Sequence, residues 1–202
     1  MPRIIILRHG NTFDKNDVVR RVGKQTDIPL SSSGRQQVEK LAAFFGTSEF
    51  RFSRVISSPL RRTQETARIV LSDYPHAPDV EIDQGLVEID YGPDDGKPES
   101  DVIARVGSEA MEQWERNALA PDGWHVDTTE IKSFWAQLFS SLKQEKSDVL
   151  VVTSNGVARF AIDAIGASWP EKFPKLKTAH FGIVSIDASG DYSVLCWNKS
   201  AE

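Results

Sequence analysis

Cysteine is nearly absent from this sequence, with Cys196 the only one among 202 residues. An intrachain disulfide is therefore excluded, and so is a structural zinc site built on a pair of cysteines. Long apolar runs are also missing. The first run, Ile4 to Leu7, is too short for a signal sequence or a membrane span and continues directly into Arg8 and His9. These absences favour a protein of the reducing cytoplasm.

The sequence also lacks an excess of positive charge. Its formal net charge is −5, so neither nucleic acid nor an anionic membrane is expected as a partner, although a local basic pocket is compatible with this composition. What is present is an ordinary globular composition, 40% hydrophobic and 26% charged, which is enough for one well-filled core. We expect a single domain over residues 1–202.

Strand and helix patterns alternate along most of the chain. The apolar run from Arg3 to Leu7 predicts a buried strand, and Ser31 to Thr47 predicts a helix capped by a serine. The same order repeats as a strand over Arg54 to Ser58 and a helix that begins at Pro59 and runs to Tyr74. Residues 148–166 show it once more, as a strand, a polar turn and a helix.

The middle of the chain has a different character. Residues 77–100 are rich in Pro, Gly and Asp and predict no long regular element. Two helices are expected after them, over Ser108 to Asn117 and Asp127 to Lys146, and residues 182–198 predict a terminal hairpin. The whole pattern indicates a three-layer α/β/α fold with a mainly parallel central sheet and an antiparallel hairpin at its edge.

In such a sheet, ligands bind beyond the carboxyl ends of the strands. Three polar turns of this sequence follow predicted strands: Arg8 with His9, Ser57 with Ser58, and Thr153 to Gly156. The two serines lack the Gly-x-Ser-x-Gly elbow of a hydrolase nucleophile. We expect the three turns to converge on one site.

The turn after the first strand, "RHGNT", has residue types suited to phosphoryl chemistry. A neutral imidazole such as that of His9 is a competent nucleophile when one ring nitrogen is held by a hydrogen bond. Arg8 supplies a planar charged fork that matches phosphate oxygens, and Gly10 lets the backbone approach an anion. If the stretch stood alone, a surface Arg-His pair in a polar loop would be the favoured interpretation.

Two further stretches fit the same chemistry. "SSPLRRTQETA" places Arg61 and Arg62 at a helix N-terminus, where the backbone amides also favour anions. "LVEIDYGPDDG" places Glu88 in a turn-rich loop, where burial would suit it to act as a general acid. Taken singly, the arginines are compatible with a solvated helix face and Glu88 with one more exposed carboxylate.

In their order along the chain, these blocks resemble the histidine phosphatase superfamily, the phosphoglycerate-mutase-like proteins. The resemblance rests on four ordered blocks and covers most of the chain. They are "LRHGNT" together with "QTDIPLSSSGRQQ", "ISSPLRRTQETA", "GLVEIDYG" and "VLVVTSNGVARFAI". The stretch at about 99–146 matches least, which implies a variable helical insertion there.

The resemblance implies a role for individual residues. His9 would be the nucleophile that becomes phosphohistidine, and Arg8 and Arg62 would clamp the phosphoryl group. Glu88 would protonate the leaving alcohol and then activate water. Asn16 would match an asparagine of the phosphate pocket. No metal and no cofactor is implied, and the acidic stretch "GPDDG" lacks the ligand spacing of a calcium loop.

The last block departs from the family pattern. Where the family has Thr-His-Gly or Ser-His-Gly, this chain has Ser154 in place of the histidine and Asn155 after it. Both are candidate phosphate contacts, but a serine carries no charge, and loss of a charged donor typically costs about two to three orders of magnitude in rate. An engineered change at Ser154 is one explanation, but the second departure favours natural divergence.

Other residues have two interpretations. His180 is either a compensating group near the phosphate or an ordinary partly buried histidine, whereas His76 and His125 lie in loops outside the blocks. The tryptophans of the middle segment form either an aromatic wall over a substrate or core packing. They are Trp114, Trp124 and Trp135.

The leading function is therefore hydrolysis of a small phosphomonoester through a phosphohistidine, with reduced activity if Ser154 is a handicap. The alternative is a non-catalytic phosphoester-binding module, and a mutase is less favoured because the chain is short and the second histidine is missing. The expected partner is a small phosphorylated substrate, with no nucleic acid and no membrane. The oligomeric state stays open, a homodimer included.

Overall fold

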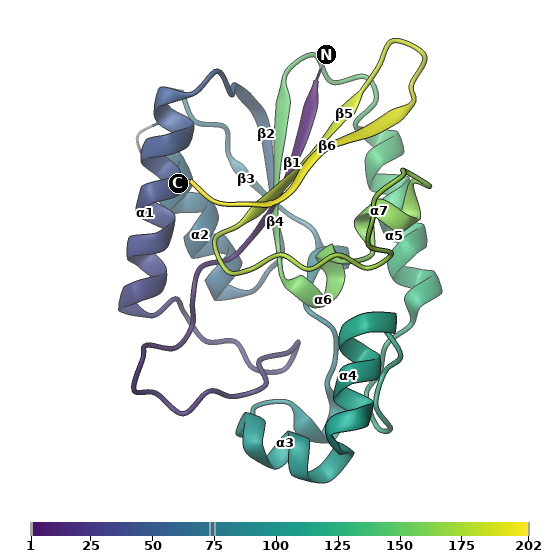
Figure 1. Ribbon diagram of the computed structural model, residues 1–202. Helices are drawn as coiled ribbons and strands as arrows, with labels where there is room; N and C mark the ends of the chain where they lie inside the picture. Colours follow the sequence, from purple (N-terminus) through teal and green to yellow (C-terminus); the bar gives the residue numbers. More distant parts are fainter. Residues whose placement is uncertain (1, 73, 75, 202) are drawn as a thin grey trace.

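The strands of the described residues form one mixed sheet in the order β3-β2-β4-β1-β5-β6 (Figure 1). The computed structural model describes residues 2–72, 74 and 76–201. The strands are β1 (Arg3–Arg8), β2 (Phe52–Ser57), β3 (Val80–Ile82), β4 (Asp148–Thr153), β5 (Phe181–Ile186) and β6 (Tyr192–Lys199). The first four strands run parallel, whereas β5 and β6 form an antiparallel hairpin at one edge. The predicted fold class and edge hairpin are confirmed.

Helices cover both faces of this sheet, as alternate side chains of the central strands require. Ile5 and Leu7 of β1 face a core shared with α1 (Ser32–Thr47) and α2 (Arg61–Leu71). Ile4 and Ile6 face the opposite core, shared with α5 (Thr128–Ser141) and α7 (Ala161–Ala164). Because both faces are buried, β1 and β4 are apolar throughout their centres.

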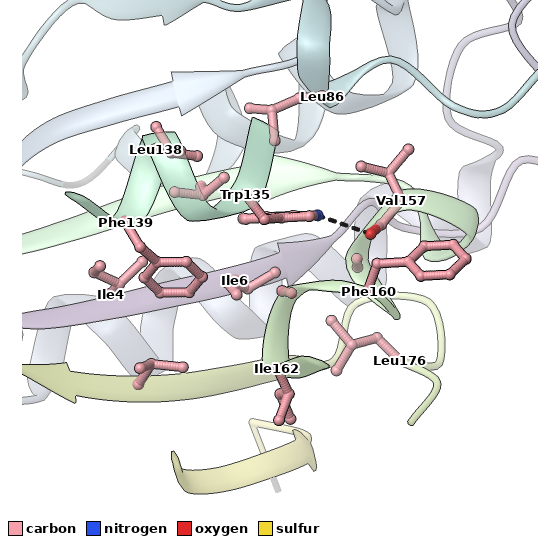
Figure 2. Close-up of a cluster of buried hydrophobic side chains, with 14 of the residues drawn as sticks. Ile4, Ile6, Leu86, Trp135, Leu138, Phe139, Val157, Phe160, Ile162 and Leu176 are labelled. Atoms are coloured by element: carbon pink, nitrogen blue, oxygen red, sulfur yellow. Dashed lines mark hydrogen bonds between the residues drawn. The ribbon is translucent and has the colours of Figure 1, made fainter. Parts of the chain in front are cut away.

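Trp135 lies at the middle of the second core (Figure 2). Its side chain is fully buried, and its indole Nε1 donates a hydrogen bond of 2.9 Å to the carbonyl oxygen of Val157. This bond joins α5 to α6 (Asn155–Ala158), the short helix that follows β4. Trp135 is therefore core packing, and it fixes the backbone just beyond the β4 turn.

Several predicted helix boundaries are confirmed by their caps. Ser31 caps α1 by accepting from the backbone N–H of Gly34, and Asp127 caps α5 by accepting from Thr129 and Glu130. The helix over Ser108–Asn117 forms as predicted and is α4. The prediction that α5 reaches Lys146 is wrong, because the helix ends at Ser141 in hydrogen-bonded turns.

Other boundaries differ from the prediction. Pro59 precedes α2 rather than starting it, because Leu60 is the N-cap residue; α2 ends at Leu71, and Asp73 in the predicted helix lies outside the described residues. The predicted helix after β4 is divided into α6 and α7.

The Pro-rich middle holds two short helical turns, η1 (Gln84–Leu86) and η2 (Gly92–Asp94), and then α3 (Glu99–Val106), a helix the sequence analysis missed. Its last turn is tied back by Arg105 Nε, which donates to Asp94 Oδ1 at 2.7 Å.

The carboxyl ends of β1, β2 and β4 lie at the same end of the sheet, at the bottom of Figure 1. The purple loop at residues 10–31, helices α3 and α4, and α6 surround this end. Among the described residues, no helix is long and apolar enough to cross a lipid bilayer.

Candidate active site

A cavity of about 700 Å³ opens at the carboxyl end of the sheet. Its lining has two parts, which we name separately. The inner wall consists of Arg8, His9, Glu88, Asn155 and Gly156. The outer rim consists of charged side chains from the surrounding loops and helices, namely Asp14, Lys15, Arg20, Arg21, Glu99, Glu115 and Lys175.

His9 follows β1 and is held by the backbone on both sides. Its N–H donates to Thr153 at 3.2 Å, and its carbonyl accepts from Ala179 at 3.1 Å. The ring Nδ1 lies 2.7 Å from the carbonyl oxygen of Gly10, and because that oxygen only accepts, Nδ1 carries the proton and Nε2 keeps its lone pair. Gly10 has no room for a side chain, since a Cβ there would lie 2.6 Å from the carbonyl oxygen of Gly34.

The electrostatic setting keeps this imidazole neutral. Burial, followed by the charges of Arg62 and Arg8, holds the pKa of His9 well below 6.5. Only 6% of the residue is exposed. A neutral ring with its free nitrogen in a cavity meets the main requirement for a nitrogen nucleophile.

Arg8 and Arg62 place two guanidinium groups near His9. Nη1 of Arg8 donates to the carbonyl of Leu176 at 2.8 Å, and Arg8 lines the cavity. Arg62 is fully buried, is absent from the cavity lining, and donates to the carbonyls of Thr26 (3.0 Å) and Gly23 (3.2 Å). Within the described residues, Nε of each arginine has no hydrogen-bond partner. Burial lowers the pKa of both groups, and the Glu88 carboxylate opposes this shift.

Glu88 is a buried member of the inner wall, not an exposed carboxylate. Its oxygens accept from the backbone N–H groups of Ile89 (2.9 Å) and Gly156 (3.3 Å). Burial raises the pKa of Glu88 above 4.5, against the opposing effects of these amides and of Arg62 and Arg8. A Cβ at position 156 would overlap Oε1 of Glu88, so glycine is required beside the carboxyl group.

The turn after β4 places its two unusual residues differently. Ser154 is fully buried, is absent from the cavity lining, and its Oγ has no hydrogen-bond partner among the described residues. Asn155 does line the cavity, and its Oδ1 accepts from the backbone N–H of Leu176 at 2.8 Å.

The family model for the histidine phosphatase superfamily (branch 1) matches residues 4–200. The chain belongs to this superfamily. It is 26% identical over 198 residues to 2,3-bisphosphoglycerate-dependent phosphoglycerate mutase 2 of Gloeobacter violaceus, covering 95% of this chain and 88% of the relative. It is 37% identical over 98 residues to the uncharacterized phosphatase PhoE of Bacillus subtilis, and that match spans 48% of each chain.

Solved structures share the histidine phosphatase fold. A mycobacterial glucosyl-3-phosphoglycerate phosphatase in complex with VO3 superposes with a TM-score of 0.81 at 24% identity, over 99% of this chain and 100% of the other. YhfR of Bacillus stearothermophilus gives a TM-score of 0.80 at 23% identity, over the full length of both chains. At this level of identity the likeness establishes the fold.

Some residues that we considered from the sequence do not line the cavity. Asn16 lies exposed in the loop after β1. His180 is partly buried, with its Nδ1 3.0 Å from the carbonyl of Thr178. Ser57 and Ser58 are fully buried; Ser57 Oγ donates to the Ser58 carbonyl, and Ser58 Oγ bonds to Thr63 Oγ1 in the first turn of α2. The side chain of His125 is 72% exposed. The roles assigned to Asn16 and His180 stay predictions.

The sequence did not predict the outer rim, because its residues come from segments that are far apart along the chain. Arg21 forms an ion pair with Glu99 and lies 5.1 Å from the ring centroids of Tyr91 and Trp124. Lys175 forms an ion pair with Glu115. The adjacent arginines in "VVRRVGK" were a visible signal for Arg21, whereas nothing in "KFPKLK" distinguished Lys175 from its neighbours.

The aromatic prediction has a mixed outcome. Of the three tryptophans, Trp114 alone lines the cavity. Trp124 packs edge-on against the ring of Trp114, and the two ring centroids are 5.4 Å apart. In the described ranges, no group of three His, Cys, Asp or Glu side chains is placed to hold a metal ion. The inner wall can offer a phosphorus atom a nucleophile, a cation and a carboxyl group whose pKa is raised.

Proposed function

We propose that this histidine phosphatase superfamily member hydrolyses a small phosphomonoester through a phosphohistidine on His9. The observation that carries the proposal is the buried, neutral His9 ring, fixed through Nδ1 at 2.7 Å from the Gly10 carbonyl, in the same cavity wall as Glu88. The cavity of about 700 Å³ suits a small organic substrate.

In the first step, Nε2 of His9 attacks the phosphorus atom and the bond to the leaving oxygen breaks. The protonated carboxyl group of Glu88 gives its proton to that oxygen, so the alcohol leaves neutral. Arg8 and Arg62 balance the charge on the phosphoryl oxygens, with Asn16, Ser154 and Asn155 as further candidate contacts. The raised pKa of Glu88 supports its role as the acid.

In the second step, the Glu88 carboxylate takes a proton from water, and the water oxygen attacks the phosphorus. The bond between phosphorus and Nε2 breaks, which releases inorganic phosphate, and both His9 and Glu88 return to their starting protonation states. No metal or other cofactor enters this scheme. The phosphatases among the relatives support hydrolysis, and the Gloeobacter relative is the reason a mutase stays a lesser candidate.

A second candidate is a module that binds phosphoesters without cleaving them. One observation favours it: Ser154, at the position of the second family histidine, is buried and uncharged. Both candidates use the arginines, and they differ in whether His9 becomes phosphorylated. In either case, the partner is a small phosphorylated molecule.

The deciding measurement is hydrolysis of phenyl phosphate without added metal by wild type, His9→Ala and Ser154→His. Wild-type turnover that disappears in His9→Ala, with an acid-labile phosphoryl group trapped on wild type alone, supports the phosphatase. His125→Ala is the matched control, because this histidine is exposed and lies outside the cavity. Activity that appears only in Ser154→His supports the binding module.

A further inference from the structure

The turn after β4 lacks the charged group that the family pattern has there. Ser154 stands where the family has a histidine, and its hydroxyl faces no hydrogen-bond partner in the described part of the chain. His180 does not replace this group, because its Nδ1 is engaged near the carbonyl of Thr178 and its side chain is absent from the cavity lining. Another cation does line the cavity, Lys175 in the segment that follows α7.

The backbone beside Lys175 is fixed to the inner wall at two points. The N–H of Leu176 donates to Oδ1 of Asn155 at 2.8 Å, and the carbonyl of Leu176 accepts from Nη1 of Arg8 at 2.8 Å. Leu176 itself is only 1% exposed, so the anchor is buried. Lys175 therefore starts one residue from a peptide group that touches the Arg8 guanidinium.

The second departure from the family pattern thus has a structural consequence. The family glycine that Asn155 replaces has no side chain to accept the Leu176 amide. Asn155 holds the backbone of Leu176, the residue after Lys175, and Leu176 in turn contacts Arg8, each through a hydrogen bond of 2.8 Å.

The charge on Lys175 is available for exchange. Its partner in the structure is Glu115, and the two side chains are 47% and 36% exposed. An ion pair this exposed contributes little to stability, so a phosphoryl anion can compete with Glu115. Burial, then the charges of Arg8 and Arg21, lowers the pKa of Lys175 below 10.5.

We propose that Lys175 is a catalytic residue that supplies to the transferred phosphoryl group the positive charge that Ser154 lacks, and that Asn155 is the residue that positions it. The inference rests on the proposed function, since it concerns the same reaction at His9. A lysine is a compact charge with three donors on a flexible stem, and it binds phosphate oxygens without a fixed fork geometry.

The test compares kcat for phenyl phosphate in wild type, Lys175→Met and Lys177→Met. Lys177 is the matched control, because it lies two residues away, is exposed and is absent from the cavity lining. We expect Lys175→Met to lower kcat on the order of 10²-fold, as for loss of a charged transition-state donor. KM should change less, and Lys177→Met should behave as wild type. Asn155→Gly should lower kcat, whereas Asn155→Asp, which keeps the acceptor, should lower it less.

A rescue experiment distinguishes a role of Lys175 as a source of charge from a merely structural role. Ser154→His should restore kcat in the Lys175→Met background and add much less in the wild-type background, because the two groups serve the same charge. Ser154 is fully buried, so folding of each variant is checked by thermal unfolding. If the histidine variant does not fold, saturable rescue of Lys175→Ala by ethylammonium, with none for Lys177→Ala, serves as the readout.

The two proposals fail differently. Turnover that depends on His9 but is equal in Lys175→Met and Lys177→Met overturns the role of Lys175 and leaves the phosphatase standing. A loss in Lys175→Met that neither the added histidine nor ethylammonium restores also overturns it, in favour of a structural role. Absence of His9-dependent turnover in wild type overturns both proposals.

Discussion

The inner wall and the outer rim of the cavity are built in different ways. The functional groups of the wall are held by backbone contacts: the Gly10 carbonyl orients His9, and two amides hold Glu88. The rim is held by side chains that pair with each other, such as Arg21 with Glu99. Backbone contacts persist when solvent conditions change, whereas partly exposed ion pairs exchange with salt and with anionic ligands. Changes in the wall should therefore alter kcat, and changes in the rim should alter affinity, with Lys175 as the one rim residue that we propose to act on kcat.

The largest effect is expected from Glu88→Gln, because an amide of the same shape cannot transfer the proton. We expect kcat for phenyl phosphate to fall by about 10²–10⁴-fold, the usual contribution of general acid catalysis. The fall should be much smaller for 4-nitrophenyl phosphate, whose leaving group needs little protonation. Steady-state kinetics with both substrates check this, and equal losses for the two would contradict the role of Glu88 as the acid.

A smaller effect in the same wall is expected from Gly156→Ala. The added Cβ would overlap Oε1 of Glu88, so the carboxyl group must move away from its place in the cavity. A misplacement of about 1 Å typically costs about 10²-fold in rate, and we expect kcat to fall by that order.

Gly46→Ala is the matched control, since nothing lies within 4 Å of the added Cβ in α1. There we expect unchanged kcat and a gain of about 0.5–1 kcal/mol in the free energy of unfolding. An unchanged kcat in Gly156→Ala would show that the wall is less rigid than its backbone contacts indicate.

The pH dependence of the wall follows from the two shifted pKa values. Phosphorylation of His9 needs a neutral ring and a protonated Glu88. The ring is neutral above its pKa, which is held well below 6.5, and the carboxyl group is protonated below its pKa, which is raised above 4.5. Single-turnover rates of phosphoenzyme formation should therefore decline about tenfold per pH unit above the Glu88 pKa. Glu88→Gln should abolish this alkaline decline, and its persistence would assign the decline to another group.

The comparison also explains what the sequence could predict. Arg8, His9 and Gly10 are consecutive and follow a buried strand, so their place at the strand end could be predicted from local pattern alone. The sequence identified Glu88 because it lies in the block "GLVEIDYG". Its place in the site also depends on the backbone N–H of Gly156, 68 residues away, which donates to its carboxylate. The starts of α1, α4 and α5 were accessible because a cap residue begins α1 and α5, and a glycine precedes α4.

The rim could not be predicted, because its contacts join residues with no local relation. Arg21 and Glu99, for example, are 78 positions apart. Helix α3, which carries Glu99 to the cavity, begins directly after Pro98, in a segment whose composition indicates turns. Its last turn is held to Asp94 by Arg105, a contact that no periodicity reveals.

The smallest effect is expected at the rim, from Glu99→Gln. The change leaves Arg21 beside the rings of Tyr91 and Trp124 but removes its carboxylate partner, so the cavity becomes more positive. A partly exposed pair is worth roughly 0.2–1 kcal/mol, so we expect KM for phenyl phosphate to fall by at most about fivefold with kcat unchanged. The gain should shrink between low and high salt, because screening acts on exposed charges. Glu109→Gln, the same charge change on the exposed surface of α4, should leave KM as in wild type. A tenfold loss of kcat in Glu99→Gln would contradict the distinction between the inner wall and the outer rim. It would mean that the ion pair of Arg21 with Glu99 also holds the catalytic groups in place.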